Sequence, residues 1–159
     1  MDRDLSNVEI FTDGACRGNP GRGGWGVLMR YKSAEKTFYG GLLDTTNNRM
    51  ELTAVIEGLK ALKRYCRVTV VSDSNYVLQG VQKWLPNWKR CDWRRNSKTP
   101  VKNIDLWKKL DFVMQGHEIT WQWVKGHSGH AENERADSLA NLGIANLADE
   151  ILSLPEEDQ

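Results

Sequence analysis

Hydrophobic and polar residues alternate along several short segments of this chain of 159 residues and recur with a helical period in others. Alternation with a period of two, or a short apolar run, is typical of a strand, whereas apolar residues three or four positions apart are typical of a helix. These patterns predict five strands, at residues 7–12, 27–31, 36–43, 68–71 and 119–123. They also predict helices at residues 48–65, after Ser72-Asp73 through Val77 and Val81, at 104–114 and at 132–147.

The order of these elements indicates the fold class. Three strands follow one another, and the later strands alternate with helices, as expected for an antiparallel meander that is extended by parallel strands. We therefore predict an α/β chain with one five-stranded mixed sheet flanked by helices. The length is typical of a single domain. Residues 1–147 are expected to form it, followed by an acidic, flexible tail at residues 148–159.

Glycine is concentrated between the first two predicted strands, where six glycines lie from Gly14 to Gly26. Residues 21–26 match the glycine spacing of a dinucleotide-binding loop, but that loop is followed by a helix, and a strand is predicted here instead. We therefore reject a dinucleotide-binding fold and interpret the segment as a glycine-rich turn between strands.

Several functional classes are excluded by what the sequence lacks. No apolar run approaches the roughly 18 residues of a membrane span, and the charged residues 1–4 do not resemble a signal peptide. Cys16, Cys66 and Cys91 are scattered, which favours a reducing cytoplasm over a disulfide framework. His127 and His130 have no second pair of ligands, so a zinc site is not expected.

The net charge of +1, from 22 Lys+Arg and 21 Asp+Glu, hides an uneven distribution. Nine basic residues oppose two acidic ones in residues 83–109, where Trp84, Trp88 and Trp93 are interleaved with the charges. Basic side chains neutralise phosphates and indole rings pack on sugars or bases, so this segment suits a nucleic-acid strand. The alternative is a solvated basic face whose tryptophans anchor a small helical subdomain. Residues 149–159 carry five acidic residues and no basic one.

Four carboxylates are candidates for chemistry. Asp13 and Asp73 each end a predicted strand, and these strands are expected to be neighbours in the sheet, so the two side chains can meet at one edge. Glu51 lies in the first turn of the long helix, and Asp137 lies beside the apolar stripe of the last one. Structural interpretations remain open: a turn for Asp13, a capping box for Glu51 with Asn48, a helix cap for Asp73 and solvation for Asp137.

Convergence of these carboxylates would change their interpretation. Clustered carboxylates repel one another unless a cation neutralises them, and hard oxygen ligands select Mg²⁺ or Mn²⁺ over zinc. Two such ions about 4 Å apart can activate a water and stabilise the leaving oxygen in phosphodiester hydrolysis. Sequence separation alone does not establish the convergence.

Four motifs, in this order, resemble those of bacterial type 1 ribonuclease H. They are FTDGACRGNPG at residues 11–21, TTNNRMEL at 45–52, SDSNYV at 72–77, and VKGH with ENERAD at 124–137. The resemblance extends from about residue 8 to residue 142. It implies the ribonuclease H fold for residues 1–147. It also implies endonucleolytic cleavage of the RNA strand of RNA/DNA hybrids, leaving 5′-phosphate and 3′-hydroxyl ends.

The resemblance further implies a catalytic site. Asp13, Glu51, Asp73 and Asp137 match the family's metal-binding carboxylates, which implies Mg²⁺ as cofactor, with Mn²⁺ as a substitute and two ions when substrate is bound. His127 matches a histidine on a mobile loop that assists proton transfer or product release, and an imidazole titrates near neutral pH. The expected partner is an RNA/DNA hybrid, with no membrane, and the expected state is a cytoplasmic monomer.

The resemblance also implies three groups of substrate-binding residues. Side chains near the minor groove of the hybrid, where 2′-hydroxyls distinguish it from DNA, match Cys16, Asn19, Asn47 and Asn48. Asn75, also expected to contact the substrate, replaces a glutamine that is familiar after the Asp-Ser pair. Thr46 and Asn103 match a pocket for a phosphate of the DNA strand, beside which Asp44 replaces a common basic residue and should weaken the contact. The basic protrusion that grips the DNA strand in some members matches Trp84, Trp88, Lys89, Arg90, Trp93, Arg94 and Arg95.

Two other functions are weighed against this one. A non-catalytic hybrid-binding module would gain nothing from an acidic cluster that faces phosphates, so the carboxylates disfavour it. A related nuclease on the same fold, such as a resolvase or transposase, is disfavoured by the basic segment with its three tryptophans.

Overall fold

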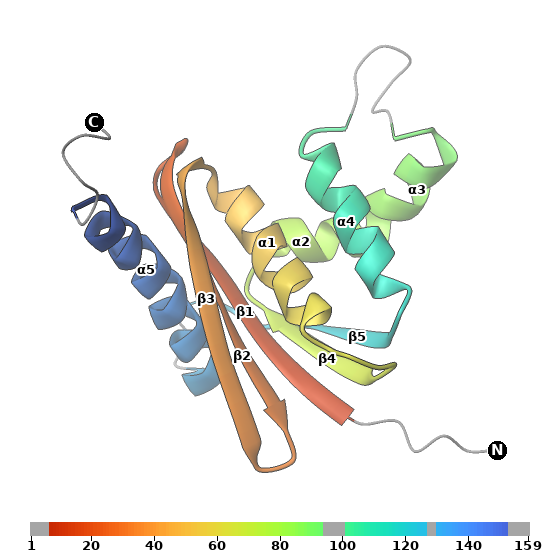
Figure 1. Cartoon of the computed structure of the whole chain (residues 1–159). Helices are drawn as coiled ribbons and strands as arrows, with labels where there is room; N and C mark the ends of the chain where they lie inside the picture. Colours follow the sequence, from red (N-terminus) through yellow and green to blue (C-terminus); the bar gives the residue numbers. More distant parts are fainter. Residues whose placement is uncertain (1–6, 94–100, 127–129, 153–159) are drawn as a thin grey trace.

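A computed structural model describes residues 7–93, 101–126 and 130–152. The expectations for Arg94, Arg95 and His127, and for the tail beyond residue 152, lie outside the described residues. Five strands form one sheet in the order β3-β2-β1-β4-β5 (Figure 1). Their bounds are β1 Asn7–Gly18, β2 Gly21–Tyr31, β3 Ala34–Thr45, β4 Arg67–Ser72 and β5 Glu118–Trp123.

The pairing of the strands confirms the predicted mixed sheet. β2 lies antiparallel to β1 and to β3, which gives the meander. β4 lies parallel to β1 on its other side, and β5 lies parallel to β4. β1 is therefore central, with the meander on one side and the parallel extension on the other.

The predicted glycine-rich turn is wrong. β1 continues to Gly18 and β2 begins at Gly21, so most of these glycines lie inside strands. A Cβ atom at Gly14 would lie 2.4 Å from the backbone nitrogen of Glu51, and one at Gly26 would lie 2.5 Å from the carbonyl oxygen of Ala136. Glycine is required here because two helices pack directly against the strand backbone.

The predicted helices are present in the predicted order, α4 with the predicted bounds and the others with different ends, and α3 was not expected. They are α1 Asn47–Lys60, α2 Asn75–Gln79, the π-helical η1 Gly80–Trp84, α3 Leu85–Arg90, α4 Ile104–Met114 and α5 Ala131–Leu152. α1 ends before the predicted residue 65 because the chain turns back to β4, where the backbone N–H of Cys66 donates to His117 Nδ1 at 3.2 Å. α5 continues past the predicted end at residue 147, so the first residues assigned to the tail are helical. None of the helices in the described part of the chain is long and apolar enough to cross a membrane.

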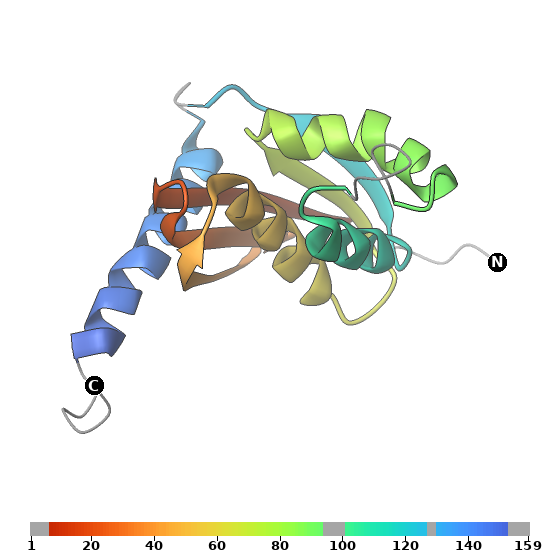
Figure 2. The same cartoon turned by 90° about the horizontal axis from the view of Figure 1, so that it is seen from above.

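The core lies on both faces of the sheet because neighbouring strand residues point to opposite sides. Ile10 of β1 packs into the large cluster that includes side chains of α1 and α4. The next residue, Phe11, packs into a smaller cluster with Ala136 of α5. α5 accordingly covers one face of the sheet, whereas α1 and α4 cover the other (Figures 1 and 2).

Candidate active site

The two central strands bring Asp13 and Asp73 together. Thr12 of β1 is paired with Ser72 of β4 in parallel register, so the next residue of each segment lies at the same edge of the sheet. The structure thus places these two carboxylates side by side, as their strand positions predict. The alternative of an Asp13-Gly14 turn is wrong, since both residues lie within β1.

Glu51 and Asp137 reach the same place from opposite faces of the sheet. Gly14, beside Asp13 in β1, has no side chain to hold off the backbone of α1 at Glu51. Gly26 is the ladder partner of Asp13 and leaves the same room for α5 at Ala136, the residue before Asp137. The bare backbone on both faces therefore brings the two helices, and with them two further carboxylates, to Asp13.

Hydrogen bonds orient the carboxylate of Glu51. Ser74 Oγ donates to Oε2, and Asn47 Nδ2 donates to Oε1 at 3.1 Å. Ser74 also accepts a bond of 3.1 Å from the backbone N–H of Val77 and so caps α2, the role that the sequence offered to Asp73. The N-cap of α1 is Thr46, so the capping box for Glu51 is wrong as well.

All four carboxylates line one cavity of about 220 Å³. Gly14, Asn47, Asn133 and Glu134 complete its lining. Asn133 and Glu134 were not expected from the sequence, although the helical spacing of four and three residues before Asp137 places them on its face of α5. Asn133 is buried, and its side-chain oxygen has no hydrogen-bond partner among the described residues.

Burial and crowding disfavour negative charge in this cavity. Burial, reinforced by the charges of Asp73 and Asp137, raises the pKa of Asp13 to about 9. Burial also raises the pKa of Glu51, with a contribution from Asp73, while the bonds from Ser74 and Asn47 oppose the rise. Asp13 is therefore negatively charged at neutral pH only if positive charge joins the cluster.

The donor set fits a hard divalent cation. The ionisable groups that line the cavity are all carboxylates, and no His or Cys is present in its described lining. Among the residues that the structure describes, no three His, Cys, Asp or Glu side chains already surround one ion position. A cation that displaces the proton favoured at Asp13 would remove the repulsion, and carboxylate oxygens are the ligands that Mg²⁺ prefers.

The residues expected near the minor groove gather beside the cavity. The backbone N–H of Asn47 donates to Asn19 Oδ1 at 3.2 Å, and Cys16 Sγ lies 3.4 Å from the carbonyl oxygen of Thr45. These contacts join the end of β1, the β1–β2 connection and the start of α1. Asn48 and Asn75 are exposed near the starts of α1 and α2.

Arg49 connects the two residues of the expected phosphate pocket. Its backbone N–H donates to Thr46 Oγ1 at 3.3 Å, and its Nη1 donates to Asn103 Oδ1 at 3.3 Å. The guanidinium also forms a two-bond ion pair with Asp105, at 2.9 and 2.7 Å. Sequence reasoning missed Arg49, although it lies within the TTNNRMEL motif.

The tryptophans of the basic segment build a helical subdomain. The rings of Trp84 and Trp88 have centroids 5.8 Å apart, and Trp88 packs against Trp107 at 5.3 Å. Lys108 Nζ lies 5.6 Å from the ring centre of Trp93. These contacts support the anchoring alternative for the rings. The exposed cations Lys89 and Arg90 remain available on the surface, although Lys89 forms an ion pair of 3.1 Å with Asp111.

A mixed sheet in this order, with an acidic cavity beside its central strands, defines the class of ribonuclease H-like nucleases. The RNase H family model matches residues 5–145, and the chain belongs to the ribonuclease H family. Ribonuclease HI of Neisseria meningitidis serogroup B is 62% identical over 141 residues, which are 89% of this chain and 97% of that protein.

Solved structures agree with this family. LC9-RNase H1, a type 1 RNase H with the type 2 active-site motif, is 33% identical with a TM-score of 0.84, over 92% of this chain and 75% of that one. LC11-RNase H1, solved in complex with an RNA/DNA hybrid, has the same fold at 22% identity and a TM-score of 0.68. That match covers 89% of this chain and 99% of the other. The family, the fold and the enzyme class predicted from the motifs are confirmed.

Proposed function

We propose that this protein is an endonuclease that hydrolyses the RNA strand of RNA/DNA hybrids and leaves 5′-phosphate and 3′-hydroxyl ends. The observation that carries the proposal is the cavity in which Asp13, Glu51, Asp73 and Asp137 meet. Family membership supports the reaction class, and LC11-RNase H1 was solved with such a hybrid bound. A module that only binds nucleic acid would be weakened by four carboxylates facing phosphates.

The four carboxylates would hold Mg²⁺, or Mn²⁺ in its place, with two ions present when substrate is bound. Such ions supply positive charge that lowers the pKa of a water and stabilises the leaving oxygen of a phosphodiester. Ser74 and Asn47 fix the orientation of Glu51 by bonding both of its oxygens. His127, which lies outside the described residues, is assigned to proton transfer or product release at the same site.

Recognition of the hybrid is assigned to the residues beside the cavity. Polar groups of Cys16, Asn19, Asn47, Asn48 and Asn75 are suited to read 2′-hydroxyls in a minor groove. Thr46 and Asn103, with Arg49 between them, are suited to hold a phosphate of the DNA strand.

The basic segment is assigned to the flanking part of the DNA strand. Lys89, Arg90, Arg94 and Arg95 supply the positive charge for its phosphates. Trp84, Trp88 and Trp93 support these cations from inside the subdomain and offer ring edges to sugars. We assign catalysis to residues 1–147 of a cytoplasmic monomer, and no catalytic role to the acidic residues that follow.

One assay tests this proposal. Labelled RNA/DNA hybrid, duplex DNA, duplex RNA and single-stranded RNA are each incubated with the protein, with Mg²⁺ or with a chelator. We expect loss of RNA from the hybrid only, and only with Mg²⁺. Tight binding of an intact hybrid would instead indicate a binding module, and cleavage of duplex DNA would indicate a different nuclease of the same fold.

A further inference from the structure

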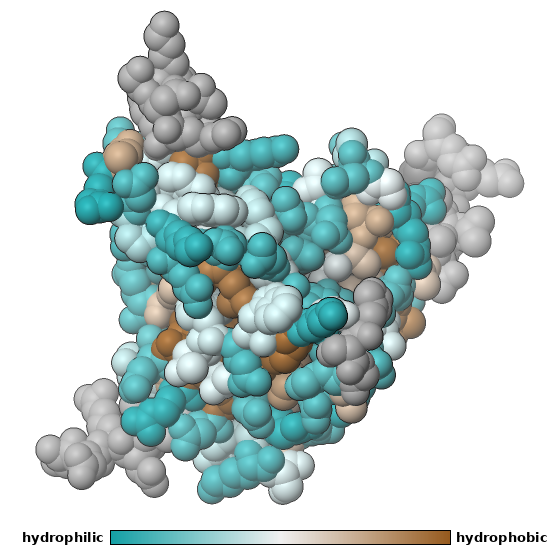
Figure 3. Space-filling view, turned by 180° about the vertical axis from the view of Figure 1, so that it is seen from behind, coloured by the Kyte–Doolittle hydropathy of each residue, from teal (hydrophilic) through white to brown (hydrophobic). Residues whose placement is uncertain are grey.

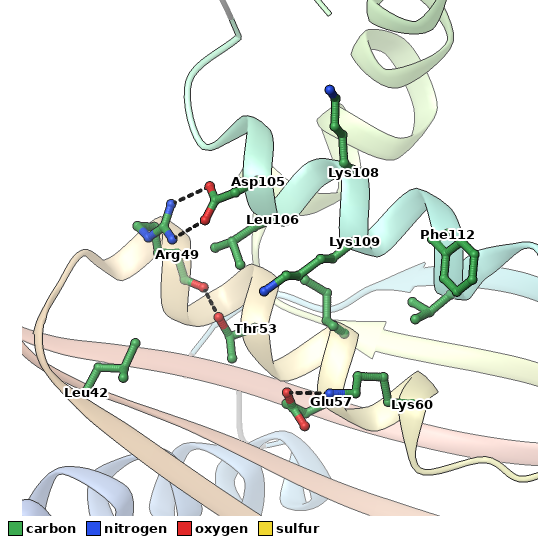
Figure 4. A pocket seen from close by; sticks show the side chains of 12 residues that line it. Leu42, Arg49, Thr53, Glu57, Lys60, Asp105, Leu106, Lys108, Lys109 and Phe112 are labelled. Atoms are coloured by element: carbon green, nitrogen blue, oxygen red, sulfur yellow. Dashed lines mark hydrogen bonds and ion pairs between the residues drawn. The ribbon is translucent and has the colours of Figure 1, made fainter.

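The start of α1, the helix that carries Glu51, is anchored at two points. Thr46 caps it by accepting a hydrogen bond from the backbone N–H of Arg49, whose guanidinium is held by Asp105 of α4 through two bonds (Figure 4). Arg49 also borders the α1–α4 groove, a concavity of about 670 Å³ whose lining has more basic than acidic residues and includes Lys60. The position of Glu51 thus depends on the cap of its own helix and on a second helix.

The first turn of α5, the helix that carries Asp137, buries no apolar side chain. Among residues 131–134 only Asn133 is buried, and the first buried apolar residue of the helix is Ala136. This end of α5 lies towards the side of the molecule that faces away in Figure 1, as the view from above shows (Figure 2). On that side, hydrophobic residues form small patches between hydrophilic ones (Figure 3). Polar contacts must therefore hold the first turn of α5 in place.

His130 supplies the polar contacts with which the helix begins. Its backbone carbonyl oxygen accepts a bond of 2.9 Å from the N–H of Glu134. Its imidazole Nδ1 accepts a bond of 3.2 Å from the backbone N–H of Asn133. This is the geometry of an N-cap, in which a side-chain acceptor pairs with one of the N–H groups that the first turn leaves free. Asparagine, aspartate and serine are the usual residues at such a position, and a histidine fills it here.

The imidazole of His130 is also in contact with the sheet. Its ring centre lies 6.0 Å from that of Phe11. Phe11 is a buried residue of β1 and lies two positions before Asp13. The ring of His130 therefore connects the strand of Asp13 with the helix of Asp137.

The cap requires an unprotonated Nδ1, because only then does this nitrogen carry a lone pair. Glu132 Oε2 lies 3.6 Å from the same nitrogen, so a proton on Nδ1 would bond Glu132 and leave the N–H of Asn133 unpaired. Arg30 of β2 lies 3.4 Å from Oε1 of Glu132 and 2.8 Å from a carboxylate oxygen of Glu35 on β3. Arg30 thus provides Glu132 with a cationic partner other than the imidazole.

We propose that His130 is a positioning residue of the active site, whose neutral imidazole caps α5 and thereby sets the place of Asp137 in the acidic cavity. The capped turn also contributes Asn133 and Glu134 to the lining of that cavity. Asp137 follows one helical turn later, so a shift of the first turn would move all three side chains together. The consequence for catalysis rests on the proposed function, in which Asp137 holds a metal ion.

A scalar coupling across the N–H···N hydrogen bond tests the cap without any activity measurement. In protein labelled with ¹⁵N, we expect coupling at pH 7.5 between the amide nitrogen of Asn133 and Nδ1 of His130, with the chemical shift of an unprotonated Nδ1. His130→Ala should shift the amide resonances of Asn133 and Asp137. His130→Asn restores a neutral acceptor at the N-cap and should return the resonance of Asp137 towards its original place. Absence of the coupling, or a protonated Nδ1, would overturn the proposal.

Hybrid cleavage tests the positioning. His130→Ala should lower kcat about 3- to 10-fold at saturating Mg²⁺ and leave KM within about 2-fold of the parent value, since the geometry of the site changes and the hybrid contacts do not. His130→Asn should restore most of kcat. Arg135→Gln is the matched control, because it removes an ion pair of the same end of α5 with Glu35 but no capping acceptor, and its kcat should equal that of the parent.

Two results would count against the positioning role: a parental kcat in His130→Ala, or a kcat in His130→Asn that is as low as in His130→Ala. Absence of cleavage by all of these proteins, the parent included, would refute the proposed function instead. The scalar coupling would then still decide whether His130 caps α5.

Discussion

Helix α1 contributes to two charged concavities of opposite sign, and they are built in opposite ways. The acidic cavity takes Glu51 from its first turn and crowds like charges in a buried place, where the pKa of Asp13 rises to about 9. The groove takes Lys60 from its last turn and surrounds exposed apolar residues with charges that are partly paired. Buried like charges make binding of a counter-ion obligatory for ionisation, whereas exposed pairs are screened and contribute little. Substitution of a carboxylate in the cavity should therefore abolish activity, whereas substitution of exposed cations should reduce it gradually.

The largest effect is expected from Asp13→Asn. The amide keeps the shape of the side chain but removes one carboxylate from the centre of the cluster. Because we propose that Asp13 holds the catalytic ions, its loss should reduce kcat by about 10³-fold or more, with little change in the Kd for the hybrid. Single-turnover cleavage and a binding titration measure the two quantities.

Glu9→Gln is the matched control for Asp13→Asn, because Glu9 is an exposed residue of the same strand. Its activity should equal that of the parent protein. If Asp13→Asn retained comparable turnover, Asp13 would have no place in the catalytic site.

A smaller and graded effect is expected from Lys89→Ala/Arg90→Ala. Both side chains are exposed, so each contributes a screened contact with phosphate rather than a buried one. We expect KM to rise about 3- to 10-fold and the slope of log KM against log salt to fall by about 2, with kcat unchanged. Lys36→Ala should change neither quantity. A salt slope identical to that of the parent would remove these two residues from the DNA contact.

The smallest effect concerns stability. Because the pKa of Asp13 is raised above its unfolded value of 3.8, folding favours the protonated form. The stability of the metal-free protein should therefore fall as the pH rises from about 4 towards 9. Asp13→Asn removes this penalty and should raise the free energy of unfolding at pH 7.5 by at least about 1 kcal/mol.

Denaturant titrations at pH 5 and pH 7.5, with and without Mg²⁺, measure this difference. Mg²⁺ should stabilise the parent protein more than Asp13→Asn, since it neutralises the same charge. Equal stability of the two proteins at pH 7.5 in the absence of metal would contradict the buried-charge account.

The sheet and its central pair of carboxylates could be predicted from local patterns. α4 matches its predicted range, and the proximity of Asp13 to Asp73 follows from parallel neighbouring strands. The prediction for the glycines between residues 14 and 26 was wrong because two different structures share a glycine-rich composition. One is a turn, and the other is a strand whose backbone packs directly against a helix. Whether glycine serves close packing depends on a partner distant in sequence, which one-dimensional periodicity does not contain.

The residues missed within the site share that cause. Ser74 lies within the SDSNYV motif, but its bond to Glu51 joins the start of α2 to α1, which the motif does not reveal. Arg49 was likewise hidden, because its partners Asn103 and Asp105 lie more than fifty positions away. The α1–α4 groove was not expected at all, since it exists only once two helices have packed.

Gly14 and Gly26 limit how the cavity can change in evolution or by design. Since a methyl group at either position would overlap the backbone of a helix, substitution there displaces all of α1 or α5 rather than one side chain. The spacing of the carboxylates is therefore set by contact between the main chains of strands and helices. Substitutions at neighbouring positions cannot change it in small steps. A changed preference for the cation that we propose binds here would therefore require exchange of the carboxylates themselves.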